Sequence, residues 1–455
     1  MIGHPLLSQL QPVLDAELFG DDVGFSSVSI DSRTLQPGAL FVAIEGPSFD
    51  GHDFVEAARE AGAAAAIVRT PVNTLLPQLQ VADTRLALGQ VGRWVRRQFK
   101  GPVVAITGSC GKTTVKELCA SIFAQMGSVH ATRGNLNNDF GAPLTLSQLE
   151  DQHRYAVIEL GASAVGEIEY SVALVEPNAV LVNNVSAAHI EGFGSLRAIA
   201  QAKGEIISGL TSDGTAVLNL DDPFYEYWQG LCGEHRIICF SVRRNEADLH
   251  AANIHADSES CTFNLCYGGA EYPVALGLAG EHNVSNALAA AGLAIAAGAE
   301  VEQVVAGLEA ARPVAGRGVS LQGVGGCRII DDTYNANPAS FRAAIDLLSK
   351  YRSEKVLVVG DMAELGSEAI EAHRQLGSYA RQQGIDALYA VGPLSAEAAW
   401  AFGAGAFSTL DKQELISALT KRAASGVTFL VKGSRSSKME EVVAAMSNEV
   451  SGGAH

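Results

Sequence analysis

The feature that most constrains the fold is a strand–loop–helix segment at residues 103–114. Four apolar residues, Val103–Ile106, run directly into Thr-Gly-Ser-Cys-Gly-Lys-Thr-Thr, which begins at Thr107. A short apolar run that enters a glycine loop and then a helix is typical of a buried parallel strand. Such strands carry helices on both faces of their sheet, so the segment predicts an α/β fold.

The loop has the composition of a phosphate-binding loop. Gly108 and Gly111 allow a tight turn in which backbone N–H groups face phosphate oxygens, and the next helix adds positive charge at its N-terminus. Lys112 has the reach for terminal phosphates, and the Thr113 hydroxyl is a suitable Mg²⁺ ligand. The standard P-loop has a further glycine where this chain has Ile106, so an ordinary glycine turn that caps a helix is the alternative.

Apolar runs alternate with helical segments beyond this loop, which indicates a doubly wound parallel sheet. The expected strands are Val103–Ile106, Tyr155–Leu160, Ala179–Val185, Thr215–Leu220 and Arg236–Phe240. Residues 247–280 show alternation and glycine turns instead, which predicts an antiparallel β insert. Two helices, at about 283–299 and 301–311, precede a break at Arg312-Pro313.

The flanking parts of the chain have their own patterns. Residues 1–100 mix strands with helices; we expect strands at Ser27–Ile30 and Leu40–Ile44 and helices at Phe54–Ala61 and Thr84–Gln98. Beyond residue 313 a second α/β pattern begins, with strands at Arg328–Asp332, Val356–Gly360, Ala387–Val391 and Thr428–Val431. A chain of 455 residues is long enough for about three domains, and we expect them at 1–100, 101–312 and 313–455.

Composition excludes several classes of protein. Apolar residues make up 47% and charged residues 18%, as in soluble globular chains, and the net charge of −18 argues against a nucleic-acid or anionic-membrane surface. The first 20 residues lack the pattern of a signal peptide, and no apolar run is long enough to cross a bilayer. Seven scattered cysteines indicate reduced thiols. We expect a cytoplasmic monomer.

The shorter form of the loop, Thr-Gly-x-x-Gly-Lys-Thr, resembles the Mur ligase and folylpolyglutamate synthase superfamily. The resemblance extends over nearly the whole chain. Further strings that resemble the Mur ligases are Gly134–Thr145, Asp332–Pro338, Gly360–Gly366 and Leu430–Glu440. The resemblance implies three domains: a central P-loop-type doubly wound sheet with a β insert, a C-terminal Rossmann-like α/β domain and a small N-terminal α/β domain for a UDP-sugar substrate.

The resemblance also assigns residues to ATP and to two Mg²⁺ ions. The ATP-binding residues it implies are Thr107, Gly108, Ser109, Cys110, Gly111, Lys112, Thr113, Asn283, Asn286, Arg317 and Asp332. The metal ligands it implies are Thr113, Glu159, His189 and Lys203, the last as a CO₂-derived carbamate; Lys112, His189 and Lys203 are the implied catalytic residues. Read without the resemblance, Glu159 is a strand-end carboxylate beside a ligand crevice or a solvated loop residue, and Lys203 is a solvated helix lysine.

The implied reaction joins D-alanyl-D-alanine to UDP-MurNAc-tripeptide through an acyl phosphate. The implied substrate residues are Ser32, Arg33, Asn137, Asn138, Lys432 and Arg435. Two alternatives stay open: another ligase of the superfamily, such as a folylpolyglutamate synthase, and a P-loop nucleotide switch without ligase chemistry. The sequence specifies neither the third residue of the peptide, although meso-diaminopimelate is the commoner one, nor the base that deprotonates the amine.

Overall fold

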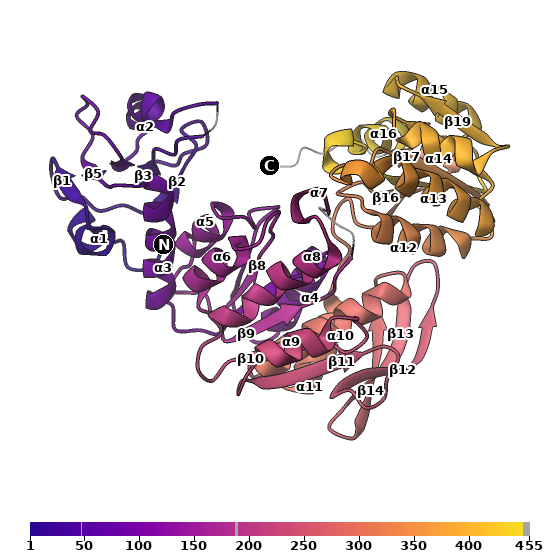
Figure 1. Cartoon of the computed structure of the whole chain (residues 1–455), viewed down its shortest axis with the longest axis horizontal. Helices are drawn as coiled ribbons and strands as arrows, with labels where there is room; N and C mark the ends of the chain where they lie inside the picture. The colour runs from indigo at the N-terminus through magenta and orange to yellow at the C-terminus, as the bar shows by residue number, and fades with distance from the viewer. Residues whose placement is uncertain (47, 187–189, 449–455) are drawn as a thin grey trace.

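The computed structural model describes residues 1–46, 48–186 and 190–448. Its strands form three separate sheets, and each sheet is built from one continuous part of the chain (Figure 1). The fold is therefore a three-domain α/β fold, as the sequence predicts. We propose that the domain limits follow the sheets, at 1–100, 101–312 and 313–455.

The N-terminal sheet has five strands in the order β1-β5-β4-β3-β2, and β1 is the antiparallel one. These strands are β1 (Glu17–Phe19), β2 (Ser27–Ser29), β3 (Ala39–Val42), β4 (Ala65–Val68) and β5 (Gln78–Gln80). Its helices are α1 (Leu7–Leu14), η1 (Gly51–Phe54), α2 (Val55–Glu60) and α3 (Thr84–Gln98). The expected helix at Phe54–Ala61 is thus a 3₁₀ turn followed by a short α-helix, and Asp50 caps that turn by accepting from the His52 N–H.

The central sheet has nine strands in the order β14-β13-β12-β11-β10-β9-β6-β8-β7. Its strands are β6 (Val103–Thr107), β7 (Val129–Ala131), β8 (Tyr155–Glu159), β9 (Ala179–Val182), β10 (Thr215–Asn219), β11 (Arg236–Ser241), β12 (Leu249–Ala256), β13 (Cys261–Tyr267) and β14 (Ala270–Leu276). The strands from β7 to β12 run parallel; β13 pairs antiparallel with β12, and β14 pairs antiparallel with β13. The predicted β insert therefore extends the parallel sheet instead of forming a sheet of its own.

Helices cover both faces of the central sheet. They are α4 (Lys112–Ala124), α5 (Gly141–Ser147), α6 (Glu167–Val175), α7 (Ile190–Phe193), α8 (Leu196–Gly204), η2 (Glu205–Gly209), α9 (Tyr225–Leu231), α10 (Glu281–Ala296) and α11 (Val301–Ala310). Alternate residues of β6 enter opposite cores: Val104 and Ile106 pack with α4 and α10, and Val103 and Ala105 pack with α6. Burial on both faces explains the continuous apolar runs.

The C-terminal sheet has six strands in the order β15-β16-β20-β17-β18-β19, and all but β15 run parallel. Its strands are β15 (Val319–Gln322), β16 (Arg328–Asp332), β17 (Glu354–Gly360), β18 (Ala387–Val391), β19 (Ala406–Thr409) and β20 (Val427–Lys432). Its helices are η3 (Val324–Gly326), α12 (Pro338–Ser349), η4 (Gly366–Glu368), α13 (Ala369–Gln382), α14 (Ser395–Phe402), α15 (Lys412–Arg422), η5 (Arg435–Ser437) and α16 (Glu440–Met446). In the described part of the chain, no helix has the length and apolar character to span a bilayer.

Helix α3 belongs to two cores at once. Leu88 and Val91 pack with the N-terminal sheet, whereas Val95 and Phe99 pack with the central domain. The buried guanidinium of Arg96 donates to the carbonyl oxygens at the C-terminal end of α6 at 2.8 Å each. The N-terminal and central domains therefore share a continuous helical layer.

Candidate active site

The phosphate-binding loop follows β6, at the point in the sheet where the next two parallel strands lie on opposite edges of β6. Since β8 pairs with one edge of β6 and β9 with the other, their carboxyl ends open a crevice beside residues 107–113. The loop needs glycine at position 111, where φ is +80°. A Cβ there would overlap Oδ1 of Asn286 and would lie 2.7 Å from Nδ2 of Asn183. The backbone is thus held in a closely fitting cradle.

Two asparagines that the sequence prediction missed hold this loop. Asn183 and Asn184 directly follow β9; Nδ2 of Asn183 donates to the Cys110 carbonyl at 2.9 Å, and the Cys110 N–H donates to Oδ1 of Asn184 at 2.8 Å. The Asn183 amide also donates to Oδ1 of Asn286 at 3.1 Å, which links the loop to α10. A polar pair directly after a buried strand beside the loop was the signal that could have identified them.

Lys112 begins α4 and folds back over the loop. Its ammonium donates to the Gly108 carbonyl at 2.7 Å. Burial lowers the pKa of Lys112, the nearby Glu159 carboxylate opposes that shift, and the Arg317 guanidinium adds to it. The lysine therefore stands beside the phosphate cradle, next to an acidic and a basic group.

A chain of oxygen and nitrogen groups connects the central and C-terminal domains. The Thr113 hydroxyl donates to Oε2 of Glu159 at 2.9 Å and accepts from Nη2 of Arg317 at 2.8 Å. The second oxygen of Glu159, Oε1, accepts from Nδ2 of Asn137 at 2.8 Å. Glu159 is 2% exposed, and a buried carboxylate beside a hydroxyl is a donor set of the hard type that Mg²⁺ prefers. These residues fit a magnesium ion.

Arg317 reaches the loop from the far side of the proposed domain limit. Its guanidinium lies over the Tyr334 ring, 4.1 Å from the ring centre. Its Nε is buried and has no hydrogen-bond partner among the described residues. A cation held by an aromatic ring and left with an unused donor is suited to an anionic ligand.

Lys203 is buried although it is a lysine. It ends α8, is 2% exposed, and its ammonium lies 5.6 Å from the centre of the Phe193 ring. Burial, together with the positive charge of Lys112, lowers the pKa of Lys203 to about 7. This finding contradicts a solvated helix lysine. His189, the other residue predicted in this region, lies outside the described residues.

The C-terminal domain adds a buried ion pair at the carboxyl ends of β16 and β20. Lys432 donates to Oδ2 of Asp332 at 2.7 Å and to the Asn335 carbonyl at 2.9 Å, and it is 3% exposed. Across the domain boundary, Nδ2 of Asn337 donates to Sγ of Cys110 at 3.2 Å. The residues predicted for nucleotide and for substrate carboxylate are therefore direct neighbours.

The remaining predicted residues lie in several places. Asn283 and Asn286 are joined by a 3.1 Å hydrogen bond in the first turns of α10. Oδ1 of Asn138 accepts the Gly141 N–H at the start of α5, so this asparagine has a local structural role. Arg435 is exposed and pairs with Glu440 at 3.1 Å.

Ser32 and Arg33 belong to the N-terminal domain. The Arg33 side chain is 85% exposed and pairs with Asp31 at 2.8 Å, which lowers the pKa of that carboxyl to about 2. Among the described residues, no contact joins Ser32 or Arg33 to the phosphate-binding loop. The structure thus brings Lys112, Thr113, Glu159 and Arg317 together at one crevice, and the two N-terminal residues stand apart from them.

Three protein-family models match the chain. They are the Mur ligase family catalytic domain at residues 24–92, the Mur ligase middle domain at 106–294 and the Mur ligase glutamate ligase domain at 316–435. Together the matches fall on all three sheets.

Individual relatives match over nearly their whole length. The UDP-N-acetylmuramoyl-tripeptide–D-alanyl-D-alanine ligase of Escherichia coli K12 is 46% identical over 97% of this chain and 98% of that protein. The ligase of the same name from Haemophilus influenzae is 42% identical over the same shares. A crystal structure of MurF from Acinetobacter baumannii superposes with a TM-score of 0.91 at 36% identity, over 96% of this chain and 97% of that one. The structure of MurF from Thermotoga maritima in complex with ADP superposes with a TM-score of 0.81 at 29% identity, over 92% of this chain and 96% of that one.

Proposed function

Because the chain belongs to the Mur ligase family, we infer that it is an ATP-dependent ligase that joins D-alanyl-D-alanine to UDP-MurNAc-tripeptide. The product is UDP-MurNAc-pentapeptide, a precursor of peptidoglycan, and the reaction takes place in the cytoplasm, where the enzyme meets ATP. The full-length similarity to ligases of that name supports the choice of substrates. Arg317 contacts Thr113, and Thr113 in turn donates to Glu159. These contacts support ATP-dependent phosphoryl transfer, because they place a cation and a metal-binding carboxylate beside the phosphate cradle.

The proposed reaction begins with transfer of the ATP γ-phosphoryl group to the terminal carboxylate of the tripeptide. Lys112 gives up its bond to the Gly108 carbonyl and binds the transferring phosphate, and Arg317 uses its free donor for the same group. Both cations neutralise charge that develops on the phosphoryl oxygens. Bound Mg²⁺ supplies further charge neutralisation, with Thr113 and Glu159 as its protein ligands.

The acyl phosphate is then attacked by the amine of D-alanyl-D-alanine. The C–N bond forms, the tetrahedral intermediate expels phosphate, and the amide, ADP and phosphate leave. The chain contributes mainly by positioning, because residues of two domains must surround one nucleotide. Asn137, fixed on Glu159, is proposed to bind the peptide end of the substrate near the metal-binding carboxylate.

Lys203 is proposed to carry a carbamate in the active enzyme. A buried amine beside a second cation is costly to keep charged, and the neutral amine is the form that reacts with CO₂. The carbamate converts this position into an oxygen anion beside Lys112, where it serves as a second metal ligand. His189, by resemblance to the family, completes that second site. The N-terminal residues Ser32 and Arg33 are proposed to bind the UDP-sugar end.

One assay tests the function against its alternatives. Phosphate release is measured with ATP, Mg²⁺ and UDP-MurNAc-tripeptide, with and without D-alanyl-D-alanine. We expect turnover that requires the dipeptide and yields the pentapeptide by mass. Turnover with folate and glutamate instead would favour a folylpolyglutamate synthase, and ATP binding without any acceptor-dependent release would favour a nucleotide switch.

A further inference from the structure

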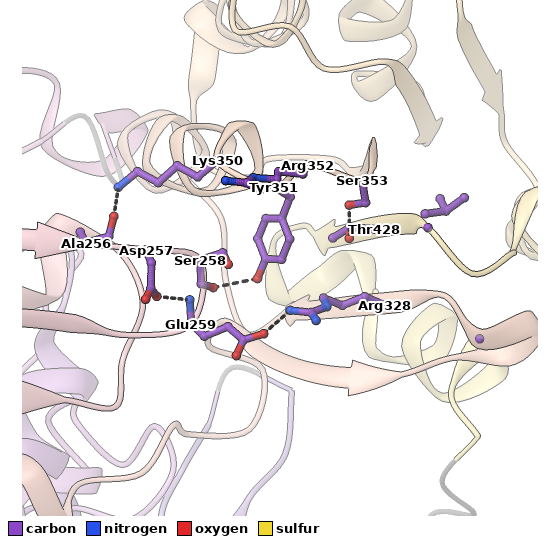
Figure 2. A pocket seen from close by; sticks show the side chains of 13 residues that line it. Ala256, Asp257, Ser258, Glu259, Arg328, Lys350, Tyr351, Arg352, Ser353 and Thr428 are labelled. Carbon is purple, nitrogen blue, oxygen red and sulfur yellow. Dashed lines mark hydrogen bonds and ion pairs between the residues drawn. The ribbon is translucent and has the colours of Figure 1, made fainter.

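The tip of the β12–β13 hairpin, residues 256–260, projects from the central domain and contacts the C-terminal domain (Figure 2). Three contacts join them: Arg328 forms an ion pair with Glu259, the Tyr351 hydroxyl donates to the Ser258 carbonyl at 2.8 Å, and Lys350 donates to the Ala256 carbonyl at 3.2 Å. The tip therefore connects two domains that are far apart in the sequence.

Each side of this contact is also held by contacts of its own. Within the tip, Oδ1 of Asp257 accepts the N–H groups of Glu259 and Ser260 at 2.8 and 2.7 Å, which fixes the turn. On the other side, the Arg328 guanidinium lies 5.4 Å from the centre of the Tyr351 ring. Groups that are already ordered lose little conformational entropy when they bind.

The contact lies at one end of two strands that carry site residues at their other end. In the parallel pair β16–β20, Arg328 is opposite Thr428, and Asp332 is opposite Lys432. Four residue steps along an extended strand separate Arg328 from Asp332, a distance of about 13 Å. Because hydrogen-bonded strands in a sheet move together, the orientation of these amino ends determines where Asp332 and Lys432 lie over the central domain.

The interface encloses open space, unlike a packed core. A cavity of about 820 Å³ lies between the tip and the strand ends, lined by charged and hydroxyl groups that include Arg352, Ser353 and Thr428 (Figure 2). The contacts named above that hold its two sides together are one ion pair and two hydrogen bonds. Contacts of this kind suit domains that associate and separate during a catalytic cycle.

We propose that residues 256–260 with Arg328 and Tyr351 form a latch that holds the C-terminal domain in the position where Arg317 meets Thr113. Glu259, Arg328 and Tyr351 are then positioning residues, because they act on the nucleotide site through β16 and β20. The proposal rests on the nucleotide site proposed above and is independent of which amine accepts the acyl group.

A charge exchange in the full-length enzyme tests the latch. The variants are Glu259→Arg, Arg328→Glu and the double variant that restores an ion pair with reversed charges. Glu246→Arg, at an exposed position in the loop that precedes β12, is the matched control for the change in charge. Tyr351→Phe removes only the hydroxyl contact and keeps the ring. The measurements are KM for ATP and kcat by phosphate release, and the radius of gyration without ligand and with a non-hydrolysable ATP analogue.

We expect each single charge reversal to raise KM for ATP about two- to fivefold, the range of a partly exposed ion pair, with kcat at saturating ATP retained. Without ligand, each single charge-reversal variant should also have a larger radius of gyration than the wild type. Tyr351→Phe should change both quantities less, and the double variant should return both toward the wild-type values. Single variants that match the control, or a double variant as impaired as the singles, would refute the latch. Absence of phosphate release in the wild type would instead refute the proposed ligase.

Discussion

Replacement of Gly111 by alanine tests how tightly the phosphate cradle is built. The added Cβ meets Asn183 and Asn286, which are 1% and 5% exposed. Neither side chain has room to move away without loss of a hydrogen bond. The two bonds at risk are those that Nδ2 of Asn183 gives to Oδ1 of Asn286 and to the Cys110 carbonyl.

The expected cost has two parts. The left-handed conformation at φ +80° costs an alanine about 1–2 kcal/mol relative to glycine. Loss of both hydrogen bonds, at about 0.5–1.5 kcal/mol each, adds about 1–3 kcal/mol. If the loop relaxes in the free enzyme, ATP binding must restore the cradle and bear this hydrogen-bond cost. ATP binding is then weakened by between about fivefold and about 150-fold.

Gly166→Ala is the matched control for the backbone part. Gly166 precedes α6 as Gly111 precedes α4, its φ is +93°, and no atom lies within 4 Å of a Cβ built there. Urea unfolding and ATP titration of both variants separate the cost of the left-handed backbone from the cost of the lost Asn183 hydrogen bonds. A Gly111→Ala enzyme that loses no more stability and ATP affinity than Gly166→Ala would show that the cradle does not constrain the loop as described.

Three further predictions follow from the site and its surroundings. Lys112→Ala should lower kcat about 100-fold or more at saturating ATP, because the γ-phosphate loses its main cation; near-normal turnover in the phosphate assay would contradict its role. Lys203→Ala and Lys203→Arg should both lose most activity, and acetate or formate should partly restore only the alanine variant, whereas full activity of the arginine variant would eliminate the carbamate. His130, 5% exposed, has its pKa lowered by burial from 6.5 to about 4, so the unfolded chain binds the proton more strongly. Stability should therefore fall by about 3 kcal/mol between pH 6.5 and pH 4, and urea unfolding of His130→Gln should lack that part of the loss.

Local patterns predicted much of the fold. Helix α3 occupies Thr84–Gln98, the range expected from the sequence, because Asp83 caps it and its apolar spacing is regular. Strand β4 (Ala65–Val68) was missed because its run of alanines is equally compatible with a helix, and only pairing between β3 and β5 makes it a strand. The three-residue strands β1 and β7 likewise depend on partners that are distant in the sequence.

The site shows the same division between local and distant information. The turn at Gly108–Gly111 could be inferred because strand, glycines and lysine are consecutive. The contact of Arg317 with Thr113 joins residues 204 positions apart, and no local sequence pattern predicts it. The role of Lys432 toward a substrate carboxylate stays a prediction. Its ion pair with Asp332 could not be inferred, because it depends on how β20 inserts beside β16.

Because α3 contributes to two cores, the chain does not divide into independent pieces at residue 100. A fragment that starts at residue 101 would lack Val95 and Phe99 and would expose the apolar surfaces of α5 and α6, an aggregation hazard. It would also leave the carbonyl groups at the end of α6 without the Arg96 guanidinium. Truncated proteins for crystallisation should therefore begin before Thr84. Chimaeras that exchange the N-terminal domain between relatives should be joined at the same place, so that the helix stays with the central domain.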